Sequence, residues 1–281
     1  MRVRNGWRVI RLFADQERQL AVRSRLVVIF AVLFAALALA VGGAGYILTG
    51  GQGVQDFART AVSLVQLVLL LVPLVALLTG VMALTPDRGA AELLYSQPVA
   101  RRHILAGKLL GLFEALAAAQ MIGFGASGAV IFSQAGSDGI GAFVVLVLGS
   151  LALTGVFLGL GALVACTNLA RRSRALSVAL VVWFLSVVLF DVAALGLASM
   201  LRSGTASRVL IAAVVINPAD AVRTGTLLAI EGDAAFGAAS LAFFRVLGGT
   251  TTAALTLGGS VLAWLIIPVL LAGRALQRAD L

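Results

Sequence analysis

The chain has 281 residues, of which 61% are hydrophobic and only 12% are charged. Soluble domains average about 45–50% apolar and about 25% charged residues, so this composition excludes an ordinary soluble protein and favours a membrane protein. The formal net charge of +9 would suggest a nucleic-acid partner for a soluble protein. Because the basic residues flank long apolar segments, we expect membrane lipids with anionic headgroups as partners, and no nucleic acid.

Six apolar segments are long enough to cross a bilayer, which takes about 20 residues of helix. They are Leu26–Leu48, Ala61–Leu84, Leu109–Phe132, Ala142–Ala165, Ala175–Met200 and Thr251–Gly273. We therefore predict an all-α membrane protein with six transmembrane helices in a single domain, residues 1–281. The first segment exceeds the apolar region of a cleaved signal peptide, about 7–15 residues, and further spans follow it.

The distribution of basic residues predicts the orientation of the spans. Seven arginines precede the first span, and basic residues recur in the second connection, in the fourth connection and after the last span. The first connection holds only Arg59, and residues 133–141 hold no basic residue. By the positive-inside rule both termini are cytoplasmic, which we expect to mean the cytoplasmic side of a bacterial inner membrane. Residues 201–250 carry four arginines and break the alternation, but long connections obey the rule less strictly.

The first 25 residues form a candidate amphipathic helix on the inner membrane surface. Trp7, Ile10, Phe13 and Leu20 can share one face of such a helix, with arginines around them. We expect an interfacial elbow helix. The alternative is a segment that only fixes orientation through its positive charge.

The cytoplasmic connection of residues 85–108 has more structure than a simple link requires. It begins with a Thr-Pro-Asp sequence typical of a helix start, and Arg88 and Glu92 are one turn apart and can pair. Pro98 ends this short helix, since the residue before a proline avoids helical geometry. A basic stretch then leads into the third span.

The connection of residues 201–250 predicts short helices on the outer face. The apolar stretch Val209–Ile216 is too short to span a bilayer. The sequence Asn217-Pro218-Ala219-Asp220 that follows it is typical of the start of a second helix. The alternative is a seventh span, which would place the basic C-terminus outside.

Catalytic and metal-binding motifs are absent from the sequence. No phosphate-binding loop occurs, because Gly107-Lys108 is followed by Leu109 and lacks the required upstream glycine. A single His103, a single Cys166 and four dispersed methionines form no metal-ligand cluster. We therefore expect no catalytic, cofactor or metal site on this chain, and no enzyme activity of its own. If ATP drives the protein, a separate chain binds it.

Two acidic residues interrupt the apolar spans, where charged groups are costly and usually face the bundle interior. Asp191, in the fifth span, is either a functional polar point or the partner of an outer arginine such as Arg202. Glu114 lies near the start of the third span, where pairing with a cytoplasmic arginine is the favoured interpretation over a functional role.

Two pairs of glycines have the spacing that lets helices approach closely in lipid. They are Gly107 with Gly111, and Gly155 with Gly159. Packing within one subunit is favoured over a dimer interface.

The stretch from Arg88 to Gly111, RGAAELLYSQPVARRHILAGKLLG, resembles the segment between spans two and three of ABC-2 type permeases. The six-span layout is also similar to that family. Within the family the chain most resembles the NosY-type permeases. The further motifs that carry this resemblance are Asp15-Gln16-Glu17-Arg18 and Asn217-Pro218-Ala219-Asp220-Ala221-Val222-Arg223.

The family resemblance implies a dimer of two permease subunits with two separate ATPase subunits, which bind ATP. It also implies a coupling helix that docks into the ATPase and corresponds here to residues 88–97. The candidate ATPase-coupling residues are Arg88, Glu92, Leu93, Leu94 and Gln97, with Glu92 foremost.

The NosY-type resemblance implies a role in denitrification, in the maturation of nitrous oxide reductase, a periplasmic copper enzyme. A periplasmic copper-delivery protein would then sit on the outer face. The candidate residues for this contact are Asn217, Pro218, Asp220 and Arg223. Because metal ligands are scarce, we expect the subunit to transmit ATPase motion or to move a sulfur species rather than to coordinate copper.

Two other functions stay open at this point. One is a general ABC-2 exporter of a drug, a lipid or a polysaccharide, which a lipid-sized apolar cavity would favour. The other is a structural scaffold or intramembrane enzyme. It is disfavoured because the sequence has no catalytic constellation and the structured cytoplasmic connection would go unexplained.

Overall fold

The computed structural model describes residues 6–49, 54–85, 99–135, 139–169, 171–232 and 238–278. All the regular structure within these ranges is helical. The helices are α1 (Gly6–Val22), α2 (Arg25–Thr49), α3 (Val54–Leu84), α5 (Arg101–Ala135), α6 (Ile140–Thr167), α7 (Arg172–Phe184), the π-helix η1 (Leu185–Leu189), α8 (Phe190–Ser199), α9 (Ser203–Ile216), α10 (Pro218–Glu231), α11 (Ala238–Leu247) and α12 (Thr250–Arg278).

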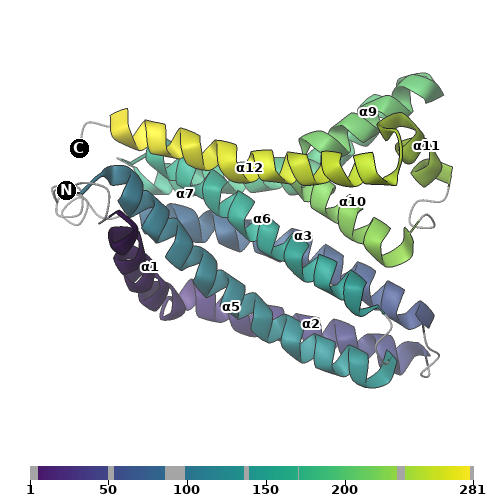
Figure 1. Cartoon of the computed structure of the whole chain (residues 1–281), viewed down its shortest axis with the longest axis horizontal. Coiled ribbons are helices and arrows are strands. Elements are labelled where there is room, and N and C mark those ends of the chain that lie inside the picture. The colour runs from purple at the N-terminus through teal and green to yellow at the C-terminus, as the bar shows by residue number, and fades with distance from the viewer. Residues whose placement is uncertain are drawn as a thin grey trace.

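Six of these elements are long and apolar enough to cross a membrane, which confirms the six spans predicted from the sequence. They are α2, α3, α5, α6, the continuous α7–η1–α8 segment and α12, and they run side by side along the long axis of the molecule (Figure 1). The third span begins at Arg101, eight residues before the predicted start. Residues 101–108, expected in the cytoplasmic connection, therefore form the first two turns of α5.

The buried core lies among α2, α3, α5 and α6. Phe34 and Phe124 are fully or almost fully buried there, with ring centroids 5.2 Å apart in an edge-to-face arrangement. Helices α3 and α6 approach closely at Gly161, where an added Cβ would come within 2.8 Å of the Leu77 carbonyl oxygen. Small residues permit this close helix packing without a hydrophobic driving force from water.

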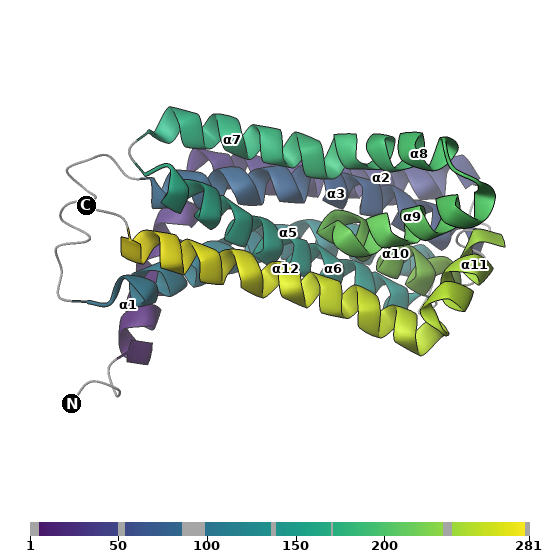
Figure 2. The ribbon, with the colours of Figure 1, turned by 90° about the horizontal axis from the view of Figure 1, so that it is seen from above.

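Spans five and six lie on opposite edges of the bundle and bury little of their surface (Figure 2). Large apolar side chains on these helices are exposed, including Val192 and Leu195 on α8, and Leu255 and Leu262 on α12. A continuous apolar surface of this kind is what lipid covers in a membrane protein.

The ends of the bundle differ in structure. Helix α1, the start of α5 and the C-terminal end of α12 lie at one end, whereas α9, α10 and α11 lie at the other (Figure 1). The predicted short helices of residues 201–250 are thus present. The pair α9–α10 bends by 103° at Asn217, so it is a broken or re-entrant segment rather than a straight seventh span.

The glycine pairs serve packing within this one chain. A Cβ at Gly107 would come within 2.6 Å of Phe13 Cβ on α1, and a Cβ at Gly111 would overlap the Ala14 carbonyl oxygen. A Cβ at Gly159 on α6 would come within 3.0 Å of Val269 on α12. The interpretation as packing within the subunit is therefore confirmed for both pairs.

Candidate functional site

The break between α9 and α10 is built by Asn217 and Pro218. The Asn217 side-chain oxygen accepts a hydrogen bond from the Ala219 backbone N–H at 3.1 Å, which caps α10. Pro218 occupies the first helical position, where its missing N–H has no intrahelical partner to lose. The helix start predicted at Asn217-Pro218-Ala219-Asp220 is confirmed.

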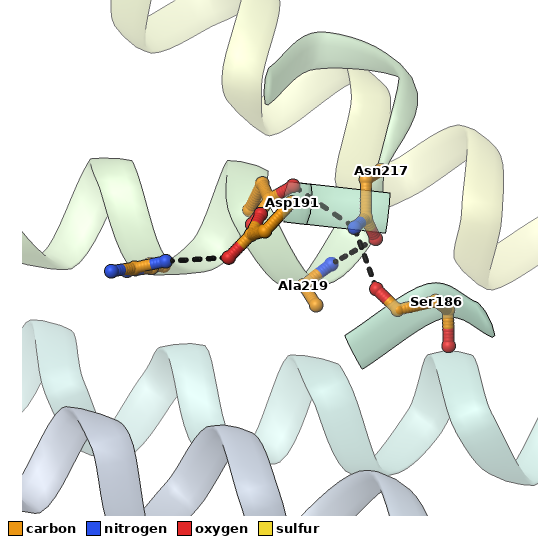
Figure 3. A network of polar contacts seen from close by, with 6 residues as sticks. Ser186, Asp191, Asn217 and Ala219 are labelled. Carbon is orange, nitrogen blue, oxygen red and sulfur yellow. Dashed lines mark hydrogen bonds and ion pairs between the residues drawn. The ribbon is translucent and has the colours of Figure 1, made fainter. Parts of the chain in front are cut away.

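The amide nitrogen of Asn217 makes two further bonds that tie this cap to its surroundings (Figure 3). It donates to the Asp220 carboxylate at 2.9 Å and to the Ser186 backbone carbonyl at 2.7 Å. Ser186 lies in the π-helical turn of span five, and such turns recur at functional positions because they interrupt the regular helical bonding pattern. The buried Asn217 therefore connects the start of α10 to the irregular turn of a membrane span.

Asp191 pairs with an arginine of α10. Its carboxylate lies 2.9 Å from Nη1 of Arg223 on α10, and the two side chains are 40% and 36% exposed. One of the two interpretations of Asp191 predicted an ion pair with an arginine of residues 201–250. The partner is Arg223, not the suggested Arg202. Spacing along the chain could not identify it, because α10 returns toward span five only after the bend at Asn217. A functional role for Asp191 stays a prediction.

A cavity of about 300 Å³ lies between α8, α9 and α10, beside the Asp191–Arg223 ion pair. Asp191, Asp220, Arg223 and Thr224 line it together with apolar side chains of α8 and α9. The sequence assigned Asp191 to a membrane position and Asp220 and Arg223 to an outer contact, whereas the structure brings these three residues to a common cavity, together with Thr224, which the sequence did not single out.

The predicted outer contact residues differ in exposure. Asn217, Pro218 and Asp220 are buried within this chain, and Arg223 is partly exposed. Direct contact of these four residues with an outer protein stays a prediction, and Arg223 is the most accessible of them.

The predicted coupling residues, namely Arg88, Glu92, Leu93, Leu94 and Gln97, lie outside the described residues. The structure does define where this segment begins and ends. Helix α3 ends at Leu84, and the buried Thr85 hydroxyl donates to the Val81 carbonyl at 2.7 Å. Helix α5 begins at Arg101, whose guanidinium donates to the Leu276 carbonyl of α12 at 2.9 Å.

Sequence reasoning missed a buried ion pair near these two ends. Lys108 on α5 lies 2.9 Å from the Glu17 carboxylate on α1 and also donates to the Ala83 carbonyl of α3 at 3.0 Å. Lys108 is the only lysine in a chain with many arginines, and this departure from the composition was the signal that could have identified the pair.

Glu114 has a different partner on the same helix pair. Its carboxylate lies 3.5 Å from Arg18 of α1, with the side chains 40% and 47% exposed. Arg18 also bonds Asp15 at 2.9 Å. Glu114 is thus part of a surface pair between α1 and α5.

A second buried polar network, also missed, joins spans three and four. The Gln120 amide donates to the Thr154 hydroxyl at 2.7 Å and accepts from the Ser150 hydroxyl, and all three residues are fully buried. Such interhelical hydrogen bonds join helices in lipid. Because each polar atom here has a partner, the network is an element of packing rather than a site.

In the described part of the chain, no group of three or more His, Cys, Asp or Glu side chains is placed so that it could hold a metal ion. Cys166 is buried near the end of α6. Its surroundings are apolar side chains of α3, α5, α6 and α12.

Comparisons with known proteins agree with this architecture. Residues 13–281 match the family model described as "ABC-2 family transporter protein". A protein of Pseudomonas aeruginosa described as "Probable ABC transporter permease protein NosY" is 32% identical over 240 residues, covering 83% of this chain and 87% of the relative. A Stutzerimonas stutzeri protein with the same description is 31% identical over 272 residues, covering 94% of this chain and 96% of the relative. The chain therefore belongs to the ABC-2 transporter family, as a multi-pass membrane permease subunit whose partner is an ABC ATPase.

Proposed function

We propose that this permease subunit supports the maturation of a periplasmic copper enzyme such as nitrous oxide reductase. The observation that carries the proposal is its similarity to two NosY permeases over 83% and 94% of its length. The subunit would transmit ATP-driven motion across the inner membrane to an outer partner, or move a small sulfur species.

The proposed orientation places both termini in the cytoplasm. Helix α1 and the C-terminal end of α12 lie at one end of the bundle (Figure 1). The exposed arginines of α1, of the C-terminal end of α12 and of the starts of α2, α5 and α7 are Arg8, Arg11, Arg18, Arg23, Arg25, Arg102, Arg171, Arg172, Arg174, Arg274 and Arg278. The positive-inside rule supports assigning this end to the cytoplasm, where α1 would lie as the interfacial elbow helix.

ATP hydrolysis would take place on the partner chain, with no cofactor on the permease. The proposed contact is the segment Arg88–Gln97, with Glu92 as its central charge. The test is Glu92→Arg in the permease reconstituted with its ATPase. We expect the permease-dependent ATP hydrolysis to disappear while the amount of permease in the membrane is unchanged. Unchanged hydrolysis would remove Glu92 from the docking role.

Copper handling would belong to the outer partner and not to this subunit. Its single histidine and single cysteine support this, because soft or imidazole ligands are what copper sites require. Equilibrium dialysis of the purified permease against Cu(I) tests the assignment. We expect no stoichiometric copper, whereas tight binding of one ion per chain would contradict it.

The outer segment containing α9, α10 and α11 would contact the periplasmic copper-delivery protein, and a second copy of the chain would complete the dimer. The partly exposed Arg223 is the foremost contact candidate. Cross-linking from a photoreactive residue at position 223 in native membranes would identify the neighbouring chain. Cross-links only to lipid or to the permease would contradict this contact.

A general ABC-2 exporter is the second candidate, because the structure has an apolar groove. The groove has a volume of about 400 Å³ and lies between α5, α6 and α12, lined by Leu110, Phe113, Gly155 and Leu265 among others. Pockets of about 300–1,000 Å³ suit drug-sized ligands. Stimulation of ATP hydrolysis by apolar drugs or lipids, abolished by Gly155→Leu, would favour export over enzyme maturation.

A further inference from the structure

The side chain of Lys108 joins three helices that are distant in sequence. Its ammonium group lies 2.9 Å from Glu17 of α1 and donates to the Ala83 carbonyl of α3 at 3.0 Å. Lys108 itself lies two turns into α5. One charged group therefore holds α1 against the ends of two membrane spans.

The Glu17–Lys108 pair is well shielded from solvent. The two side chains are only 9% and 12% exposed, in contrast to the 47% and 40% of Arg18 and Glu114 on the same two helices. A buried pair loses much of its attraction to desolvation, so it is weak evidence for stability, and in some proteins such a group instead fixes one arrangement over others. The geometry here favours a role in fixing the register of α1 on α5.

The backbones of α1 and α5 are in close contact beside this pair. A Cβ at Gly107 would come within 2.7 Å of the Ile10 carbonyl oxygen, and one at Gly111 would overlap Ala14. Because the surfaces fit at the backbone level, α1 cannot slide along α5 without a clash. The ion pair and the glycines together make a rigid contact.

This contact adjoins both ends of the segment that the proposed function assigns to the ATPase. Ala83 is in the last turn of α3, a few residues before the proposed contact segment Arg88–Gln97, and α5 begins at Arg101 after it. A force on that segment would be applied to the ends of α3 and α5, which Lys108 connects to each other and to α1.

We infer that Lys108 is a positioning residue that makes α1, the end of α3 and the start of α5 move as one body during the ATPase cycle. The inference rests on the proposed function. Glu17 is its counter-ion, and the Ala83 carbonyl is its link to α3. The elbow helix is then part of the moving unit and not only a membrane anchor.

The first experiment compares variants of the permease reconstituted with its ATPase in phosphatidylethanolamine–phosphatidylglycerol vesicles. Lys108→Met and Glu17→Gln each remove the buried pair, and Lys108→Arg keeps the charge and the donors. Glu114→Gln is the matched control, because it removes an exposed pair between the same two helices. The readouts are permease-dependent kcat and KM for ATP, and the amount of ATPase retained.

We expect Lys108→Met and Glu17→Gln to lower the permease-dependent kcat by about tenfold, since a conformational step sets turnover in such machines. The KM for ATP and the amount of ATPase retained should be unchanged in both variants. The Lys108→Arg variant should keep the wild-type kcat. Glu114→Gln should stay within about twofold of wild type, because exposed pairs contribute little.

Two results separate this inference from the proposed function. Wild-type permease without any effect on ATP hydrolysis would overturn the proposed function, and the inference with it. Wild-type stimulation that Lys108→Met leaves intact, or that falls only in proportion to lost ATPase binding, would overturn the inference alone.

A second measurement needs no disruptive variant, because Lys108 is the only lysine in the chain. An amine-reactive acetylating reagent is applied to the complex without nucleotide and during ATP turnover, and Lys108 modification is read by mass spectrometry. Arg102→Lys supplies an exposed reference lysine at the start of the same helix. We expect Lys108 to stay protected in both states. Modification at the rate of the reference during turnover would show that α1 separates from α5, and would overturn the inference.

Discussion

Arg223 on α10 lies 2.9 Å from Asp191 on span five, and the buried Asn217 amide joins the same two elements through the Ser186 carbonyl at 2.7 Å. Helix α10 is therefore attached to span five by one partly exposed ion pair and one buried hydrogen-bonded side chain. These two contacts join α10 to span five through residues that are 32 and 31 positions apart in the sequence.

The two links should differ in their contribution to stability. Asn217→Ala removes a helix cap and leaves buried groups without partners, which costs roughly 2–3 kcal/mol. Asp191→Asn removes a pair that is more than one-third exposed, so after solvent screening it costs about 1 kcal/mol or less. Unfolding of the purified permease in mixed micelles measures both. A larger cost for Asp191→Asn would contradict this ranking.

The buried network of spans three and four should couple its members energetically. A double-mutant cycle with Gln120→Met and Thr154→Val measures the interaction across their 2.7 Å hydrogen bond. Interhelical polar pairs in membranes contribute about 0.6–2 kcal/mol, and we expect a coupling in that range. Strictly additive effects would show that the two side chains do not interact.

Position 111 should be intolerant of a single added methyl group. Gly111→Ala forces a Cβ onto the Ala14 backbone, whereas Gly125→Ala, on the same helix, meets nothing within 4 Å. We expect Gly111→Ala to loosen α1. A cysteine at the buried position 14, in a Cys166→Ser background, should then react with a maleimide at least about fivefold faster, because local opening governs its exposure.

The Gly125→Ala variant is the control for this measurement. Its labelling rate should match that of the parent, and its stability should be equal or slightly higher, since alanine favours a helix over glycine by up to about 1 kcal/mol. Equal labelling of both variants would show that α1 does not rest on Gly111.

Two buried threonines at the end of α3 should respond oppositely to replacement by valine. The Thr79 hydroxyl has no hydrogen-bond partner among the described residues, whereas Thr85 donates to the Val81 carbonyl at 2.7 Å. Removing an unsatisfied buried hydroxyl should gain about 1 kcal/mol, and removing the bonded one should cost about 1 kcal/mol. Unfolding of each purified variant in mixed micelles measures both changes in stability. Destabilisation by Thr79→Val would reveal an interaction of that hydroxyl.

The six spans and the helix start at Asn217 were predictable from the sequence because both depend on local patterns. Apolar length identifies a span, and the Asn-Pro sequence supplies a cap and a first-turn proline within two residues. The third-span boundary was not found, since Arg101, Arg102 and Lys108 are charged yet helical. Arg101 and Lys108 bond to groups on α12, α1 and α3, and these contacts between distant segments are not visible in the periodicity of the sequence.

The partners of the charged residues were the least predictable part of the site. Lys108 and Glu17 are separated by 91 positions, and Asp191 and Arg223 by 32. Each pair joins two helices, α1 with α5 and α8 with α10, that lie side by side only in the folded chain. Sequence spacing alone does not reveal such neighbours. Glu17 illustrates the difficulty, because an acidic residue in a helix expected on the membrane surface is ordinarily exposed, yet here it is buried by Lys108.

The central claim is that this permease connects a cytoplasmic ATPase to a periplasmic partner. Affinity purification of the chain from its native membrane in mild detergent, followed by mass spectrometry of the chains that accompany it, tests this most directly. The account predicts an ABC ATPase together with a periplasmic copper-delivery protein. An ATPase without any periplasmic protein would contradict the maturation role and favour a general exporter, and the absence of an ATPase would contradict the claim as a whole.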